Sequence, residues 1–389
     1  MRTLAKTFSG LWKILLGAVF CQFLPTAILA VGWTYRAMQR RALRLWTRQS
    51  PVSHSELDTL AQDDPLFREH ATCPNWLIRQ RDLRGEPHQR GVRGRAAHFA
   101  RNLGGSAWLN LRIGLAGISN TSLAMILPAV LWQIGWYAGW DNSFNKGYEQ
   151  YYTGILLSWI GILLFLALML YLPMAQARQA ITGQWRYLYD LRTVWRISTG
   201  NPVRTLLLAV AFSLVALPIN VMLIAVQGFG GNDEMSALTD SEFLQFLNRY
   251  YFWVSLLAFI GFVFVRMFAA KWYAAGLLSQ LRSHRVRSSE LSGVERHALR
   301  VLQLDTPEQV ADRHPVIEAT LSVSRPMWRT AVLSAAVLVW FTFVAQIYVR
   351  EFLVYHPVRG FMNQPLVQLP WVRFIPSELQ SSFRAAEKP

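Results

Sequence analysis

The side chains that could bind a metal lie together in one polar stretch: His54, His70, Cys73 and His88. Their spacing matches none of the short Cys and His pairs that hold zinc in proteins, so we expect no metal site. The chain also lacks the Gly-x-Ser-x-Gly turn of serine hydrolases, the His-Glu-x-x-His pair of zinc proteases and the glycine-rich loop that cradles phosphates. We therefore expect no catalytic residue and no cofactor, and predict that the protein is not an enzyme.

Arginine side chains form the clearest pattern in the chain. Those that directly follow apolar stretches are Arg36, Arg40, Arg41, Arg44, Arg48, Arg178, Arg186, Arg192 and Arg196. In segment 35–48, the arginines fall on one helical face and apolar residues on the other, as in helices that lie in a headgroup layer. We expect these arginines to contact anionic lipid headgroups or a membrane-protein partner. This accounts for the net charge of +16 without nucleic-acid binding.

Polar side chains within the apolar stretches are mostly amides. Asn120, Gln133 and Asn220 could line a polar cavity for a solute, or could join helices by hydrogen bonds. Arg266 stands near the end of one apolar stretch, and we expect its side chain to extend to the interface. No apolar stretch contains Asp or Glu, although proton- and cation-coupled carriers usually need a carboxylate at depth. This pattern argues against an ion-coupled carrier.

Six apolar stretches approach the ~20 residues that cross the ~30 Å hydrocarbon layer as a helix: 14–35, 113–140, 154–173, 205–227, 251–270 and 331–349. The composition, 52% hydrophobic and 16% charged, is typical of a multi-pass membrane protein. We predict an all-α integral membrane protein with about six transmembrane helices. Arg/Trp-rich amphipathic interfacial helices would line its cytoplasmic face. The first stretch contains Pro25 and could instead form a re-entrant hairpin.

The charge of the connecting segments predicts their side of the membrane. Segments 36–112, 174–204 and 271–329 are basic, whereas 141–152 and 228–250 are acidic. Because basic loops stay in the cytoplasm, the first three segments are expected inside and the last two outside. We therefore expect a multi-pass protein of the bacterial cytoplasmic (inner) membrane.

These assignments predict the following order along the chain. It begins with a first span in 1–35, a basic helix and polar cytoplasmic loop in 36–112, and a four-span core in 113–270 that includes the basic interfacial helix 174–204. It continues with a cytoplasmic segment in 271–329, a last span in 330–349 and an extended external tail in 350–389.

One short motif resembles a known family. The run Leu172-Pro-Met-Ala-Gln-Ala-Arg178 is followed by Gly183, Tyr189-Asp190 and Val194. Over residues 154–227 this pattern resembles a family of bacterial and archaeal multi-pass membrane proteins of uncharacterised function. The resemblance implies a helical bundle in the membrane and no known reaction.

The abundance of interfacial helices, compared with the few polar groups inside the spans, favours a non-enzymatic role. We expect a scaffold or assembly factor of a membrane complex. The alternative is a facilitator, or a transporter subunit, for a small or lipid-like solute. Dry packing around the three amides would favour the scaffold, and a continuous polar cavity there would favour transport.

Overall fold

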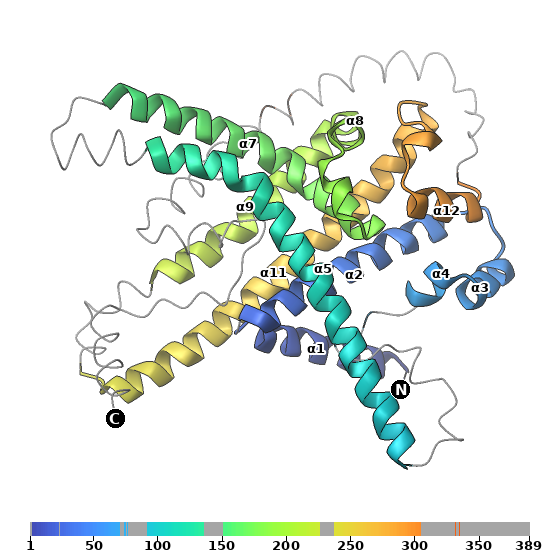
Figure 1. The fold of residues 1–389 in the computed structure, drawn as a ribbon, viewed down its shortest axis with the longest axis horizontal. Coiled ribbons are helices and arrows are strands. Elements are labelled where there is room, and N and C mark those ends of the chain that lie inside the picture. Colours follow the sequence, from blue (N-terminus) through green and yellow to red (C-terminus); the bar gives the residue numbers. More distant parts are fainter. Residues whose placement is uncertain are drawn as a thin grey trace.

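The computed structural model describes residues 2–22, 24–70, 74, 76, 92–135, 151–225 and 237–304, together with 331 and 334. Within these ranges the regular structure consists of helices, with no strand (Figure 1). The all-α prediction is therefore confirmed for the described part of the chain. Apart from residues 331 and 334, the last predicted span falls outside it, as does the C-terminal tail.

The first predicted span is divided into two helices, α1 (Arg2–Phe20) and α2 (Leu24–Gln49). Pro25 lies in the first turn of α2, where its missing N–H is tolerated. The indole N–H of Trp76 donates to the carbonyl of Lys13 at 2.9 Å, and its ring stacks on Trp33 with centroids 4.6 Å apart. Thus α1 folds back beside α2, and a single helix over 14–35 is not formed.

In the described part, α2 forms a bundle with four further long helices: α5 (Val92–Gly135), α7 (Tyr151–Thr182), α9 (Pro202–Ala225) and α11 (Asp240–Arg282). α5 packs on α7 and α2, while α11 packs on α2, α9, α1 and α7 (Figure 1). The residues just before the second apolar stretch belong to the same continuous helix, α5. α11 also continues past its apolar stretch as far as Arg282.

Two glycines allow α2 and α5 to cross closely. A Cβ at Gly32 would lie 1.8 Å from the carbonyl oxygen of Asn110, and one at Gly114 would lie 2.0 Å from that of Ile28. Both distances are far below van der Waals contact, so only glycine fits. Small residues that let helix backbones approach are typical of helix contacts in membranes.

Within the described residues, two helices are long and apolar enough to cross a membrane, Gly154–Thr182 and Asp240–Arg282, compared with the six predicted spans. Leu11–Phe20 and Pro202–Phe212 are apolar but shorter. Long core helices of soluble proteins pass the same test when they are mostly buried. In the most apolar windows of the two long helices, only 33% and 39% of the residues are buried.

The exposed faces of the long helices carry bulky apolar side chains at helical spacing. On α7 these are Leu156, Trp159, Ile160 and Leu163. On α11 they are Trp253, Leu257, Ile260 and Phe264. On α5 they are Leu123, Ile126, Leu127, Val130 and Ile134. We call these three sets the apolar stripes.

The basic interfacial helix predicted over 174–204 is interrupted. α7 ends at Thr182, and Gly183 follows with a φ of +69°, a left-handed conformation that suits glycine at a helix end. The 3-10 helix η3 (Trp185–Tyr189) and the short helix α8 (Leu191–Gly200) come next. A second break follows at residues 200–202, where α8 ends at Gly200 and α9 begins at Pro202.

Candidate functional site

The three segments that the charge pattern places on one side of the membrane meet at one end of the bundle. Ser50, just after α2, donates a hydrogen bond to the carbonyl of Leu302 at 2.8 Å. Arg196 of α8 donates to both carboxylate oxygens of Glu290, at 2.9 and 2.8 Å. We call residues 49–70, 178–200 and 282–304 the cap.

Short helices build the rest of the cap: α3 (His54–Asp63), α4 (Pro65–His70), the 3-10 helix η5 (Ser288–Glu290) and α12 (Gly293–Val301). Asp64, between α3 and α4, lies 2.6 Å from the imidazole Nε2 of His297 on α12. The cap thus connects three stretches of chain that are distant in sequence.

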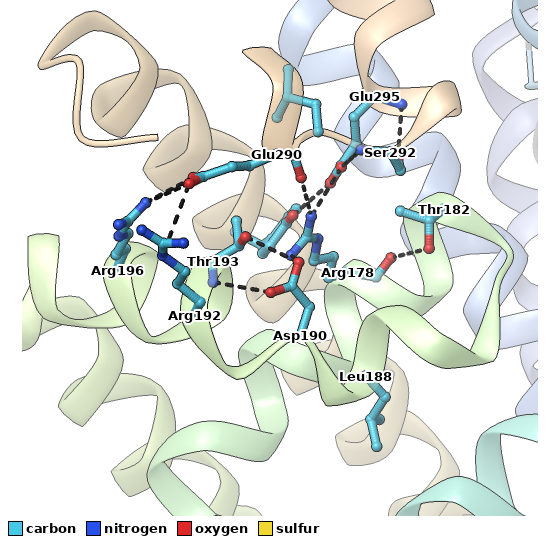
Figure 2. A network of polar contacts seen from close by, with 12 residues as sticks. Arg178, Thr182, Leu188, Asp190, Arg192, Thr193, Arg196, Glu290, Ser292 and Glu295 are labelled. Atoms are coloured by element: carbon cyan, nitrogen blue, oxygen red, sulfur yellow. Dashed lines mark hydrogen bonds and ion pairs between the residues drawn. The ribbon is translucent and has the colours of Figure 1, made fainter. Parts of the chain in front are cut away.

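Arg178, near the end of α7, lies at the centre of the cap with a fully buried side chain (Figure 2). Its Nη1 donates to the carboxylate of Asp190. Its Nη2 donates to the main-chain oxygen of Glu290 at 3.0 Å and lies 3.7 Å from Oε2 of Glu295. The ring of Tyr187 covers the guanidinium, with its centroid 5.0 Å from Cζ. A buried charge needs this degree of pairing to offset its desolvation.

Asp190 has two roles in the network. It is the N-cap of α8, and its Oδ1 accepts a hydrogen bond from the Thr193 N–H at 3.2 Å. Its Oδ2 accepts from the Thr193 hydroxyl at 3.0 Å and from Arg178. One carboxylate therefore starts α8 and neutralises the buried arginine of α7.

Glu295 is fully buried and connects three helices. With Ser292 it forms a capping box that begins α12. Its Oε1 accepts a hydrogen bond from the hydroxyl of Tyr273 on α11 at 2.5 Å, and its Oε2 faces Arg178 on α7. The position of α12 is thus coupled to both long helices.

Glu290 joins η5 to α8. Partial burial raises the pKa of this carboxyl, but the hydrogen bonds from Arg196 and the charges of Arg196 and Arg192 outweigh that effect and hold the pKa below its ordinary value. The group is therefore a carboxylate at neutral pH and ties the two elements together electrostatically.

The arginines predicted to contact lipid or a partner are placed in different environments. Arg36 and Arg178 are buried, and Arg36 donates to Oδ1 of Asn110 at 3.0 Å. Arg40 and Arg196 are half-buried. The exposed members of the set are Arg41, Arg44, Arg48, Arg186 and Arg192. Contact with headgroups remains a prediction, and these exposed side chains are the ones positioned for it.

The apolar face of α2 packs inside the protein. Met38, Ala42 and Trp46 have no exposed surface, and the indole of Trp46 donates to the carbonyl of Ala274 on α11 at 3.1 Å. The amphipathic pattern of this segment was interpreted as insertion into a headgroup layer. In the structure it reflects packing against the bundle, because a helix stripe is buried equally well by protein and by lipid.

Of the three amides predicted to line a cavity, Asn120 is half-buried, and its main-chain oxygen accepts a hydrogen bond from the Tyr189 hydroxyl at 3.1 Å. The side chains of Gln133 and Asn220 lie outside the described residues. A buried hydrogen bond between polar side chains is found elsewhere: Gln176 of α7 donates to the hydroxyl of Thr121 on α5 at 2.6 Å.

Arg266 does not extend to the surface as expected. Its side chain is buried on α11, and its Cζ lies 4.9 Å from the ring centroid of Phe262, 5.5 Å from that of Phe212 and 5.9 Å from that of Tyr35. Aromatic rings on α11 itself and on the neighbouring helices α9 and α2 attract the cation. The side chain therefore stays inside the bundle and does not extend to the interface. Among the described residues, no group of three or more His, Cys, Asp and Glu side chains could hold a metal. Cys73 and His88, two of the four side chains considered for a metal, lie outside the described residues.

The acidic members of the cap network were not predicted from the sequence. Ser292-Gly-Val-Glu295 has the spacing of a capping box, and Asp190 is the only acid in the basic segment 174–204. These two signals mark helix starts, and they could have located the carboxylates that meet Arg178. No protein-family model, no curated protein and no solved structure matches this chain.

Proposed function

We propose that the chain is a multi-pass protein of the cytoplasmic membrane and that its cap serves as a rigid scaffold for a membrane complex. The observation that carries the membrane assignment is the set of apolar stripes on α5, α7 and α11. Soluble monomers rarely expose large apolar patches, whereas lipid accepts them at no cost. The resemblance of residues 154–227 to multi-pass membrane proteins agrees with this proposal.

The interior of the bundle supports the same proposal. Helices that face lipid place bulky side chains outward and use small or polar residues for their mutual contacts. Gly32 and Gly114 form the crossing of α2 and α5, and Gln176 bonds Thr121 between α7 and α5. The basic segments gather in the cap, which fits a cap on the cytoplasmic side.

The construction of the cap favours a scaffold. Its charged groups are used to fasten α7, α8, α11 and α12 to each other, as with Arg178, Asp190 and Glu295. Groups so paired hold a fixed surface at the membrane boundary, which is what an assembly partner needs.

The test has two parts. Membranes from expressing cells are washed with alkaline carbonate, and a Ser55→Cys variant without the native cysteines is labelled with an impermeant maleimide. We expect retention in the membrane and labelling from the cytoplasmic side alone, because Ser55 is exposed on α3. Release by carbonate would contradict the membrane assignment, and labelling from outside would invert the topology.

The scaffold role is tested by gentle purification followed by mass spectrometry. We expect a partner at stoichiometric amount that is lost with an Arg178→Met variant, in which the cap is loosened, and kept with Arg249→Met, at an exposed position of α11 outside the cap. A protein that is recovered without any partner and with a retained solute would support transport instead.

Transport by a facilitator is the second candidate. Gln176 is fully buried, and its Oε1 has no hydrogen-bond partner among the described residues. A solute or water could satisfy this oxygen. If this site carries a solute, Gln176→Leu in proteoliposomes abolishes the flux, whereas Thr121→Val, which removes the same interhelical hydrogen bond but keeps the Gln176 carbonyl, preserves it. If it has a structural role only, the Gln176→Leu variant leaves any measured flux unchanged.

A further inference from the structure

The outward face of η3 and α8 is unusually apolar for the surface of a cap. The exposed fractions are 60% for Trp185, 65% for Leu191 and 53% for Trp195. The opposite face of α8 is buried through Thr193, Val194, Ile197 and Ser198. The short helix therefore presents apolar residues both to the protein and away from it, and Figure 1 shows it at the outside of the bundle.

The orientation of this face is fixed from within. Asp190 caps α8 and binds the buried Arg178, and Arg196 binds Glu290 of η5 from the half-buried side of the helix. With the start and the middle of α8 held, Trp195 and Leu191 cannot turn inward without breaking these contacts. The exposed aromatic surface is consequently a stable feature of the fold.

The charge around the face is positive. Arg186 and Arg192 are exposed beside the two tryptophans. The nearest acidic group that the structure gives is Glu290, which lies 4.0 Å from Nε of Arg192 and is bound more closely by Arg196, at 2.8 Å. Tryptophan is enriched at the headgroup level of membranes, and arginine is attracted to anionic lipid there.

The position along the chain points to lipid as the occupant. α8 connects α7 to α9, two helices that form part of the membrane bundle in the proposed function. Arg204 and Leu207, one turn apart on α9, are exposed and place a cation above an apolar side chain. The apolar surface of α8 is thus continuous along the chain with a helix face that would enter the bilayer.

We propose that the outward face of η3 and α8 (Trp185, Leu191 and Trp195, flanked by Arg186 and Arg192) lies in the headgroup layer of a membrane that contains anionic phospholipid. This inference rests on the proposed membrane location of the bundle. It assigns α8 the role of an interfacial anchor that sets the height of the cap above the bilayer.

The test uses spin labels on the full chain, without native cysteines, reconstituted in vesicles. One label is placed by Thr199→Cys, one turn beyond Trp195 on the same exposed face. Ile160→Cys on the α7 stripe reports on the bilayer, and Asp58→Cys on α3 reports on water. Relaxation by oxygen, which enriches in lipid, is compared with relaxation by a water-soluble nickel chelate.

In vesicles of phosphatidylcholine mixed equally with phosphatidylglycerol, we expect the label at 199 to be relaxed more by oxygen than by nickel. We expect the label at 58 to be relaxed more by nickel than by oxygen. The double variant R186Q/R192Q should raise the nickel effect at 199 in the anionic vesicles and should change little in pure phosphatidylcholine, because only the anionic surface attracts these charges. Trp195→Ala should raise the relaxation by nickel at 199 in both kinds of vesicle.

The outcomes separate the two proposals. Nickel access at 199 together with oxygen access at 160 overturns the inference and leaves the membrane assignment intact. Nickel access at 160 overturns the membrane assignment itself. Dipolar broadening at 199 that disappears on dilution with unlabelled protein shows that a second copy covers the face, and this also overturns the lipid anchor.

Discussion

Arg178 illustrates how a single buried cation organises its surroundings. Its guanidinium reaches Asp190 of α8, the main chain of η5 and Glu295 of α12. Each partner belongs to a different element, so the charge acts as a common attachment point for the cap. The desolvation of such a charge is offset only while all of these partners stay in place.

Replacing Arg178 by methionine should destabilise the protein by about 3–5 kcal/mol, since it leaves the buried Glu295 without its cation. The measurement is thermal or denaturant unfolding in detergent. Arg41→Met, at an exposed position of α2, is the matched control and should stay within about 0.5 kcal/mol. Equal stability of the two variants would contradict the role assigned to Arg178.

Glu290 should make the attachment of η5 to α8, and with it the position of α12 that follows η5, dependent on pH. Its pKa is lowered in the folded protein by Arg196 and Arg192, against the effect of partial burial. The resulting stabilisation is therefore complete above the ordinary glutamate pKa of about 4.3, and it is lost as the pH falls through the lower folded value.

Hydrogen exchange of the α12 amides, corrected for intrinsic rates, measures this effect. Protection should fall on acidification in the parent protein. In Glu290→Gln this part of the pH dependence should be absent, which separates it from the titration of other carboxylates. Identical pH profiles for the two proteins would exclude Glu290 as the responsible group.

At the scale of elements, the crossing of α2 and α5 depends on backbone contact at Gly32. A methyl group there would overlap the carbonyl oxygen of Asn110, and neither backbone can move without disturbing its helix. Gly32→Ala should therefore destabilise by about 1–3 kcal/mol.

Gly104→Ala, in the same α5 helix, is a strict control because nothing lies within 4 Å of the added methyl group. We expect it to be neutral or to stabilise by up to about 1 kcal/mol through helix propensity. Melting temperatures of both variants in the same detergent decide the question. A similar loss in both would indicate that glycine matters for flexibility and not for the crossing.

The whole molecule shows which features a sequence can predict. Apolar length located the stretches within α7, α9 and α11, because burial in lipid and burial in a bundle require the same composition. The charge pattern predicted that segments 36–112, 174–204 and 271–329 lie on one side of the membrane. In the structure, the cap joins parts of all three segments. These signals are local averages over many residues.

The positions of the helix breaks and of the buried charged side chains depend on contacts between single residues. Such contacts cannot be predicted from the average composition of a segment. The turn between α1 and α2 is held by Trp76, a residue of a loop that composition describes only as polar. Arg266 is drawn inward by Phe212 and Tyr35 from other helices. Similarly, the stripe of α2 predicts burial but does not distinguish protein from lipid.

Assembly of the cap in cells can be tested by crosslinking. Asp64 and His297, which touch across α3–α4 and α12, are replaced by cysteines in a chain without its native ones. A short bis-maleimide should join the two cysteines. When the chain is then cleaved between the two positions, the crosslink should keep the two fragments together. The pair Asp58→Cys and His297→Cys should react much less. Equal reaction of the two pairs would contradict the arrangement of the cap.

The Arg178 contacts also have a consequence for biosynthesis. Arg178 and Glu290 are 112 residues apart in the chain, which at 5–20 residues per second corresponds to roughly ten seconds of translation. During that interval α7 has left the ribosome and its guanidinium has Asp190 beside it but lacks η5 and α12. The nascent chain therefore passes through a stage with an incompletely neutralised cation at the end of α7. The order of synthesis therefore predicts that the cap closes around Arg178 only after η5 and α12 have been made.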